Sequence, residues 1–174
     1  MRLFLLSILV FAFSLNAKVL ISPIDAMKNT FPNSTHIKKK NIVLNGKTAE
    51  IIQKNARQKL DTKIYKIFKA YDGEEVIGYG ILISKKIRSK NGVVLYMISK
   101  DSVLKTIEVI AFNEPMEYLP SKMWNSQFQN IETSQILRLS KEIPTITGAT
   151  LSAKSVTNGS QIAFAIYNEV LKEE

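Results

Sequence analysis

Residues 75–112 read EVIGYGILISKKIRSKNGVVLYMISKDSVLKTIEVIAF, and this stretch decides the fold class. Its apolar runs are rich in β-branched and aromatic residues, which are typical of strands. Asn91-Gly92 predicts a two-residue hairpin turn with positive φ at both positions, and Lys100-Asp101 predicts a second turn. Three successive antiparallel strands are therefore expected here, with the segments 75–86 and 103–112 as the first and last of them.

The flanking sequence adds a further strand and several helices. KIYKIFKAY (63–71) is another aromatic and β-branched run, which Asp72-Gly73 separates from residue 75. This completes a meander of about four antiparallel strands. The remaining expected elements are a helix opened by Ser22-Pro23, a helix capped by Thr48, a short helix around Trp124, a strand at 135–143 and a closing helix from about Ser152 to Leu171. We expect one α+β domain over residues 18–174, an antiparallel meander flanked by helices.

The N-terminal residues have the layout of a secretory signal peptide. Arg2 supplies a positive charge, residues 3–15 are almost entirely apolar, and Ala17 is a small residue at a cleavage point. Lys18 ends the apolar run too early for a membrane-spanning helix. We expect residues 1–17 to be a signal peptide and the remainder to be periplasmic or otherwise extracytoplasmic. Because Leu15 is large for its place before the cut, an uncleaved anchor that leaves the protein membrane-associated stays open.

Composition excludes several classes of function. The 174-residue chain has 24 basic and 15 acidic residues, a formal charge of +9, one histidine and no cysteine. Without cysteine there is no thiolate nucleophile, iron–sulfur cluster or CxxCH haem attachment. His36 alone can build neither a histidine-rich metal site nor a supported hydrolase triad, so no metal site is expected. The basic residues are spread out, and an exported protein rarely meets nucleic acid, so an anionic membrane surface, acidic partner or anionic ligand fits better.

A small-residue loop precedes the closing helix in TITGATLSAKSVTNG (145–159). Such a loop exposes unpaired N–H groups which, with the helix dipole, attract phosphate. Gly148 allows close backbone approach, while Thr147, Thr150 and Ser152 add hydroxyl groups. The alternative is an ordinary turn capped by Ser152 or Thr150. The residues alone leave both interpretations open.

The same segment resembles the flavin-attachment segment of the FMN-binding domain family, whose pattern is (S/T)GA(T/S) before a Ser/Thr-rich helix start. That family includes the G subunit of Rnf electron-transfer complexes and the C subunit of the sodium-pumping NADH:quinone reductase. IDAMKNTFPNS, KIYKIFKAYDGEEVIGYG and FNEPMEYLPSKMWNSQF follow the family's order of segments. The resemblance covers most of residues 22–172.

The resemblance implies a set of cofactor-binding residues. A separate flavin transferase would move FMN from FAD onto Thr150 as a phosphoester. The implied neighbours are the flanking motif residues Thr147, Gly148, Ala149 and Leu151, with Ser152 as a hydroxyl donor, and a loop near the flavin ring, Glu114, Pro115 and Met116. The sequence departs from the family at Pro144, where an aspartate is usual, and at Asn113, where many relatives have arginine.

Together these observations predict an exported FMN-binding electron carrier that relays electrons between a membrane redox protein and an extracytoplasmic acceptor. Two alternatives remain: a noncovalent FMN- or ligand-binding module of the same fold, and a small flavin oxidoreductase. No convincing general acid or base lies beside the motif, so a carrier is favoured over a stand-alone enzyme and no catalytic residue is assigned. Lys122 and Lys154 are candidate cations for stabilising a reduced, anionic flavin.

Overall fold

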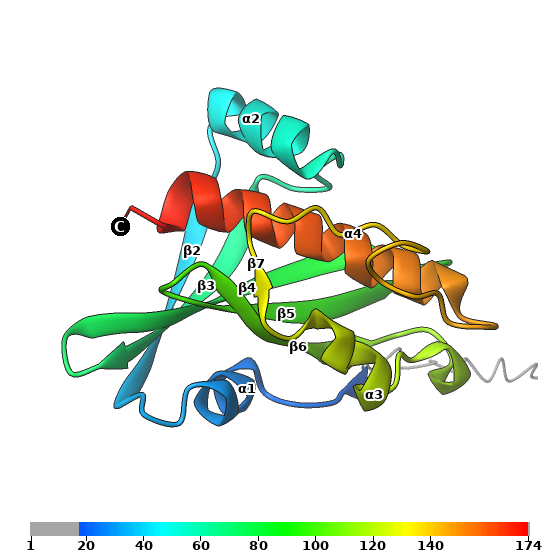
Figure 1. The fold of residues 1–174 in the computed structure, drawn as a ribbon, viewed down its shortest axis with the longest axis horizontal. Helices are drawn as coiled ribbons and strands as arrows, with labels where there is room; N and C mark the ends of the chain where they lie inside the picture. Colours follow the sequence, from blue (N-terminus) through cyan, green and yellow to red (C-terminus); the bar gives the residue numbers. More distant parts are fainter. Residues whose placement is uncertain (1–17, 174) are drawn as a thin grey trace, which may run out of the picture.

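A computed structural model describes residues 18–173, so the predicted signal peptide at 1–17 lies outside the described residues. The described residues form a seven-stranded antiparallel sheet of order β1-β6-β5-β4-β3-β2, with β7 paired to β6 (Figure 1). The strands are β1 (Lys18–Val19), β2 (His36–Val43), β3 (Ile64–Asp72), β4 (Glu75–Lys86), β5 (Asn91–Ser99), β6 (Val103–Phe112) and β7 (Ile131–Glu132). The predicted meander is confirmed, because β3 to β6 are consecutive neighbours.

The hairpin between β4 and β5 does not turn at Asn91-Gly92, so that prediction is wrong. Both residues belong to β5, where Asn91 pairs with Lys86 and Gly92 with Lys85. Neither has a positive φ. The loop consists of residues 87–90, and the Ile87 N–H donates to the Lys90 carbonyl at 2.9 Å. Gly92 serves packing instead, since a Cβ there would lie 2.6 Å from Cδ1 of Ile87.

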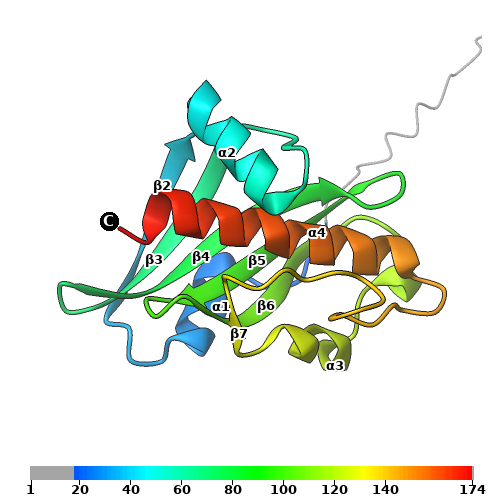
Figure 2. The same cartoon turned by 45° about the horizontal axis from the view of Figure 1, so that its top comes forward.

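Helices cover both faces of the sheet, which confirms the α+β class (Figure 2). One face carries α1 (Pro23–Thr30), whose residues share a core cluster with Phe68 and Leu95. The other carries α2 (Gly46–Ala56) and α4 (Thr150–Ile166), and α3 (Lys122–Asn125) lies beside β6. Because both faces are covered, the middle residues of β4 and β5 are buried on both sides of the sheet, whereas the ends of these strands are more exposed.

Two helix starts differ from expectation. The cap of α2 is Asn45, whose side-chain oxygen accepts the N–H of Thr48 at 2.8 Å, so Thr48 is not the N-cap. The last helix begins at Thr150 rather than Ser152 and continues beyond Ile166 as a π-helical turn, Tyr167–Leu171. Within residues 18–173, no helix has the length and apolar character needed to cross a bilayer.

The two glycines of β4 make room for α1. A Cβ on Gly78 would lie 2.2 Å from the Phe31 ring, and one on Gly80 would lie 2.5 Å from Sδ of Met27. Glycine inside a strand commonly marks such a close approach. The Gly-Tyr-Gly sequence is therefore explained by helix packing.

The predicted strand at 135–143 is wrong. In the described part of the chain this segment is irregular, with an isolated bridge between Leu139 and Ile143. The short strand β7 precedes it at Ile131–Glu132. The segment is held by side-chain hydrogen bonds in place of a strand ladder, among them one from Gln161 of α4 to the Leu137 carbonyl.

Candidate functional site

The start of α4, the β4–β5 loop and the segment after β6 border a half-open cavity of about 280 Å³. This volume is near the lower end of ligand pockets, which commonly measure roughly 300–1,000 Å³. The β4–β5 loop contributes two lining residues, the segment after β6 contributes two, and the chain at the start of α4 contributes five. The lining residues are Ile87, Arg88, Glu114, Tyr118, Gly148, Ala149, Thr150, Leu151 and Ser152.

Most of the residues that the sequence singles out for cofactor binding line this one cavity. From the motif, these are Gly148 through Ser152, and Glu114 joins them from a distant part of the chain. Thr147, Pro115 and Met116 do not line it. Thr147 is exposed one residue before the cavity wall, and Met116 is 44% exposed.

Sequence reasoning missed three lining residues: Ile87, Arg88 and Tyr118. The predicted strand 75–86 ends just before the first two and the predicted turn at Asn91-Gly92 comes after them, and no local pattern shows that this loop reaches the helix start. Tyr118 lies in the expected loop after β6, but nothing in that loop points to a cavity wall.

The backbone at the start of α4 leaves hydrogen-bond donors free. Gly148 has φ of +79°, a left-handed conformation that favours glycine. Ala149 occupies the N-cap position, and no side chain caps the helix. The expectation of a turn capped by Ser152 or Thr150 is therefore wrong. The first N–H groups of α4 have neither an intrahelical nor a side-chain acceptor, and the positive end of the helix dipole lies there.

Ser152 adds a buried hydroxyl to this set of donors. The residue is only 1% exposed and lines the cavity, and its Oγ has no hydrogen-bond partner within residues 18–173. Leaving a buried polar group unpaired costs about 1–3 kcal/mol. The cavity wall thus has several donors and lacks their acceptor, which is the arrangement that an anion would complete.

The Glu114 carboxylate is hydrogen-bonded to the backbone of the β4–β5 loop. It is 6% exposed, and its Oε1 accepts the backbone N–H groups of Arg88 at 3.1 Å, Ser89 at 2.6 Å and Lys90 at 2.7 Å. These bonds, that from Lys90 above all, hold the pKa of the carboxyl below its usual value of 4.5. They also explain the loop position, since a turn at Asn91-Gly92 would not present these three N–H groups to one carboxylate.

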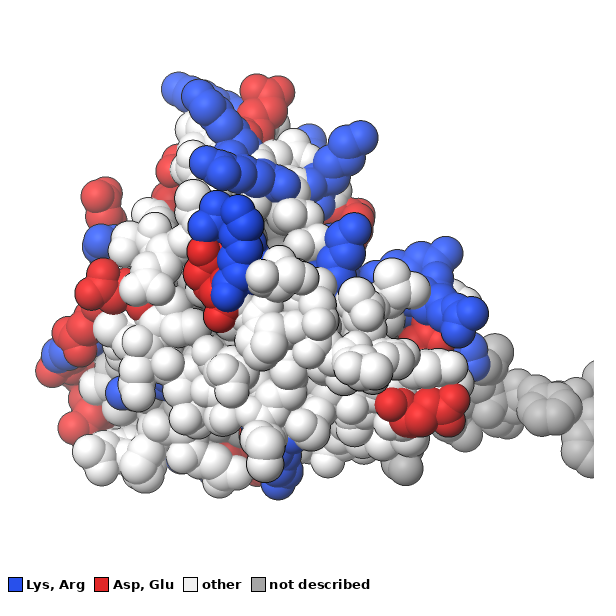
Figure 3. Space-filling model, turned by 45° about the vertical axis from the view of Figure 1, so that its right-hand side comes forward, with Lys and Arg blue, Asp and Glu red and all other residues white. Residues whose placement is uncertain are grey.

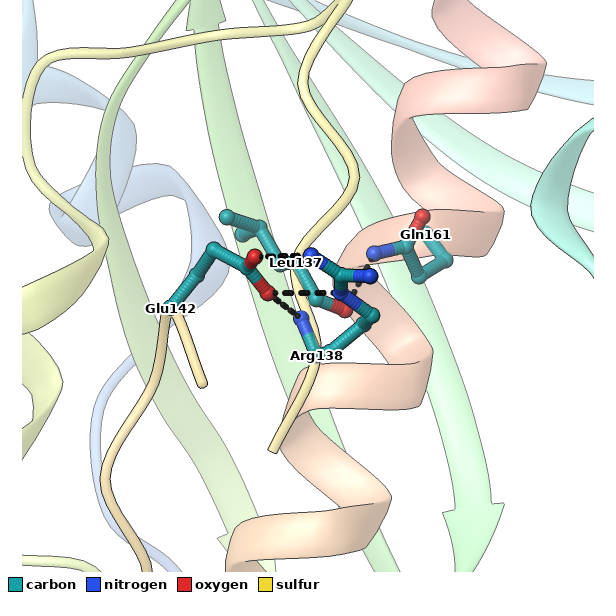
Figure 4. Close-up of polar contacts among 4 residues, drawn as sticks. All are labelled: Leu137, Arg138, Glu142 and Gln161. Atoms are coloured by element: carbon teal, nitrogen blue, oxygen red, sulfur yellow. Dashed lines mark hydrogen bonds and ion pairs between the residues drawn. The ribbon is translucent and has the colours of Figure 1, made fainter. Parts of the chain in front are cut away.

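Side-chain bonds hold the irregular segment that leads into the motif (Figure 4). The Gln161 amide of α4 donates to the Leu137 carbonyl. Arg138 donates its backbone N–H, at 2.8 Å, and its guanidinium to the Glu142 carboxylate. The hydrogen bond from Arg138 lowers the pKa of Glu142 to about 2.

A second anchor lies closer to the motif. The Trp124 indole N–H donates to the Pro144 carbonyl at 2.9 Å, and the Trp124 ring packs edge-to-face on Phe128 at 5.2 Å. Pro144, the position at which the sequence departs from the resembled family, is thus a backbone acceptor. These contacts fix the chain four residues before Gly148.

Basic side chains are unevenly distributed over the described surface, and few of them lie at the cavity. Figure 3 shows basic side chains gathered along the upper part of one face, over α2, whereas its middle is largely uncharged. The exposed basic residues of α2 and the loop after it are Lys47, Lys54, Arg57, Lys59 and Lys63. The cavity itself is lined by one cation, Arg88, and one carboxylate, Glu114. Lys122 and Lys154, which the sequence offers either as candidate cations for a reduced flavin or as solvent-facing charges, do not line it. No group of residues suited to hold a metal ion is found in residues 18–173.

Comparison with known proteins gives one informative similarity. No family model matches the chain. The chain is 31% identical over 109 residues to the G subunit of the Na⁺-translocating ferredoxin:NAD⁺ oxidoreductase complex of Acetobacterium woodii. The aligned region covers 56% of the chain and 53% of that relative, so the chain spans about half the relative's length. The resemblance to a G subunit, expected from the motif segments, is confirmed.

Proposed function

We propose that this protein is an FMN-binding electron-transfer flavoprotein whose FMN is attached to Thr150. The observation that carries the proposal is the unpaired donor set at the start of α4. Uncapped N–H groups and the buried Ser152 hydroxyl lie at a cavity where a phosphate would be their common acceptor. The similar G subunit belongs to a complex named as a ferredoxin:NAD⁺ oxidoreductase, which supports a redox role.

The cavity residues fit the two ends of an FMN molecule. Gly148 and the first turn of α4 would hold the phosphate, while Ile87, Tyr118 and Leu151 offer apolar and aromatic surface to a ring. Because the cavity is small, part of the ring would remain outside it and accessible to a redox partner. When bound, the flavin supplies one- or two-electron transfer, and the protein supplies its position and electrostatic surroundings.

Thr150 offers the hydroxyl for covalent attachment. It is exposed and lines the cavity, and among the described residues its hydroxyl makes only a long hydrogen bond of 3.4 Å to the Ile146 carbonyl. A flavin transferase would move FMN from FAD onto this hydroxyl. The Oγ1 of Thr150 would form the new phosphoester bond as the phosphoanhydride bond to AMP breaks, with AMP as the leaving group and the hydroxyl proton released. The exposure of Thr150 would give the transferase access.

We also propose that the protein works outside the cytoplasm, after removal of residues 1–17, between a membrane redox protein and an extracytoplasmic acceptor. The motivation is the apolar run at 3–15 behind Arg2. Mass measurement of the exported form should give a chain that starts near Lys18. A retained Met1 in the membrane fraction would show an anchor instead.

Peptide mapping after co-expression with a flavin transferase from the same source tests the attachment. The fragment containing Thr150 should gain the mass of an FMN phosphoester, and Thr150→Ala should lose it. Thr147→Ala is the matched control, because Thr147 is exposed and nearby but does not line the cavity. An unmodified wild-type peptide, or modification that survives Thr150→Ala, contradicts the assignment.

Noncovalent FMN binding is the second candidate, and the departure at Pro144 favours it. The aspartate usual in the resembled family is replaced there by a proline, whose backbone carbonyl accepts a hydrogen bond from the Trp124 indole N–H. In that case, yellow colour would co-purify with the protein and be released completely on denaturation. Turnover of a small substrate would instead indicate an oxidoreductase, although the one cavity-lining carboxylate, Glu114, is already occupied by the β4–β5 loop.

A further inference from the structure

We propose that Arg88 makes the cavity selective for a phosphorylated flavin over an unphosphorylated one, and that Glu114 is the positioning residue that holds Arg88 in place. This rests on the proposed FMN binding. It assigns a role to the β4–β5 loop, which the motif does not include.

The cavity combines cationic character from two separate elements. The start of α4 contributes uncapped N–H groups and the helix dipole, and the β4–β5 loop contributes the guanidinium of Arg88. No hydrogen bond or ion pair of that guanidinium occurs among the described residues; Arg88 is bonded only through its backbone N–H. Its five donors therefore remain free for a ligand.

The loop that carries Arg88 is built into this position. Glu114 gathers three consecutive backbone N–H groups, and the Ser89 hydroxyl lies 3.3 Å from both carboxylate oxygens. The absence of a side chain at Gly92 leaves room for Ile87 beside the strand. The backbone hydrogen bonds hold the pKa of the Glu114 carboxyl below its ordinary value, so the carboxylate is ionised and keeps these bonds at physiological pH. Glu114 itself has little capacity left for a ligand and acts through the loop.

A guanidinium suits a phosphate because its planar set of donors can form two parallel, charge-assisted hydrogen bonds. Such a contact discriminates between FMN and riboflavin, which differ only in the phosphate. Arg88 is exposed, so its charge-assisted contact lies at the weak end of the range for such hydrogen bonds. Removing the charge should therefore weaken FMN binding about tenfold and leave riboflavin binding almost unchanged.

The test uses protein produced without the transferase and titrated with FMN and with riboflavin, following quenching of flavin fluorescence. Wild type should prefer FMN. Arg88→Gln should lose about tenfold in FMN affinity alone, and Arg88→Lys should recover part of it. Lys90→Gln is the matched control, because it removes the same charge from the same loop at a residue that does not line the cavity. It should keep the wild-type ratio of affinities.

Glu114→Gln tests positioning, because it keeps an acceptor oxygen but removes the charge that gathers the loop. It should lower the FMN-to-riboflavin ratio while thermal unfolding shows a folded protein, an outcome that a purely structural role would not give. An unchanged ratio in Arg88→Gln, or an equal loss in Lys90→Gln, overturns the inference and leaves the proposed function standing. Wild type that binds neither flavin, covalently or otherwise, overturns both.

Discussion

Gly159→Ala should destabilise the protein although alanine is the better helix former. Gly159 lies inside α4, where its backbone faces the side chain of Tyr96. A Cβ built there would lie 2.2 Å from the Tyr96 hydroxyl oxygen and 3.0 Å from Cζ. That oxygen cannot easily retreat, since Tyr96 is 1% exposed and donates a hydrogen bond to the Val156 carbonyl at 2.7 Å.

The magnitude follows from three opposing effects. Replacing glycine by alanine inside a helix favours folding by roughly 0.8–1 kcal/mol. Overpacking a well-packed core costs about 1–3 kcal/mol. Displacing the Tyr96 hydroxyl adds about 1–3 kcal/mol if it is left buried without a partner. We expect a net loss of about 1–5 kcal/mol in the free energy of unfolding, because the two costs together exceed the helix gain.

Urea unfolding followed by circular dichroism measures this loss as a lower midpoint at unchanged slope. Tyr96→Phe supplies a double-mutant cycle, because it removes the clashing oxygen and its hydrogen bond together. The double variant should be more stable than the sum of the single effects predicts, by about 1–2 kcal/mol. A single Gly159→Ala variant as stable as wild type would show that the helix and Tyr96 separate at little cost, and the reasoning would fail.

Three further outcomes are expected. Gly78→Ala should lower the free energy of unfolding by about 1–3 kcal/mol, because its Cβ would meet the Phe31 ring, while flavin content per folded molecule stays constant. The Glu142–Arg138 contact should stabilise the fold fully above pH 4.5, the ordinary carboxyl pKa, and this stability should be lost as pH falls through about 2, the pKa of Glu142 in the folded protein. The urea midpoint of Glu142→Gln should therefore change less than that of wild type between these two pH values. Ser152→Ala should raise the unfolding midpoint of flavin-free protein, because it removes an unpaired buried hydroxyl, and weaken FMN binding.

The sheet was predictable because its signal is local and repeated. The apolar runs at 75–86 and 103–112 match β4 and β6, since covering both faces of the sheet requires continuous apolar sequence. The hairpin turn was not predictable in the same way. Asn91-Gly92 has a strong local preference, but a carboxylate from Glu114 gathers the preceding three N–H groups and moves the turn. A contact between residues so far apart in sequence leaves no local trace.

The residues of the candidate site were likewise predictable only where their signal is local in sequence. The small residues at 147–150 mark a helix start with free donors, a property of consecutive residues that sequence can reveal. Arg88 and Tyr118 reach the cavity only through the way the sheet's loops fold over α4. The segment 135–143 has apolar spacing that suggests a strand, but it is irregular. Hydrogen bonds from the side chains of Gln161 and Trp124 hold it and the residue after it in place.

The flavin-free site also carries a cost that argues for a ligand. Ser152 could be alanine without loss of packing, and Ala149 could be a serine, threonine or aspartate that caps α4; either change would relieve unpaired donors. In the β4–β5 loop, by contrast, Glu114 accepts hydrogen bonds from three consecutive backbone N–H groups. Among the described residues, Glu114 thus pairs the backbone N–H groups of the β4–β5 loop, whereas the start of α4 is left with unpaired donors. That asymmetry is what an anionic ligand would require, since the paired loop positions the Arg88 guanidinium while the start of α4 supplies N–H and hydroxyl donors.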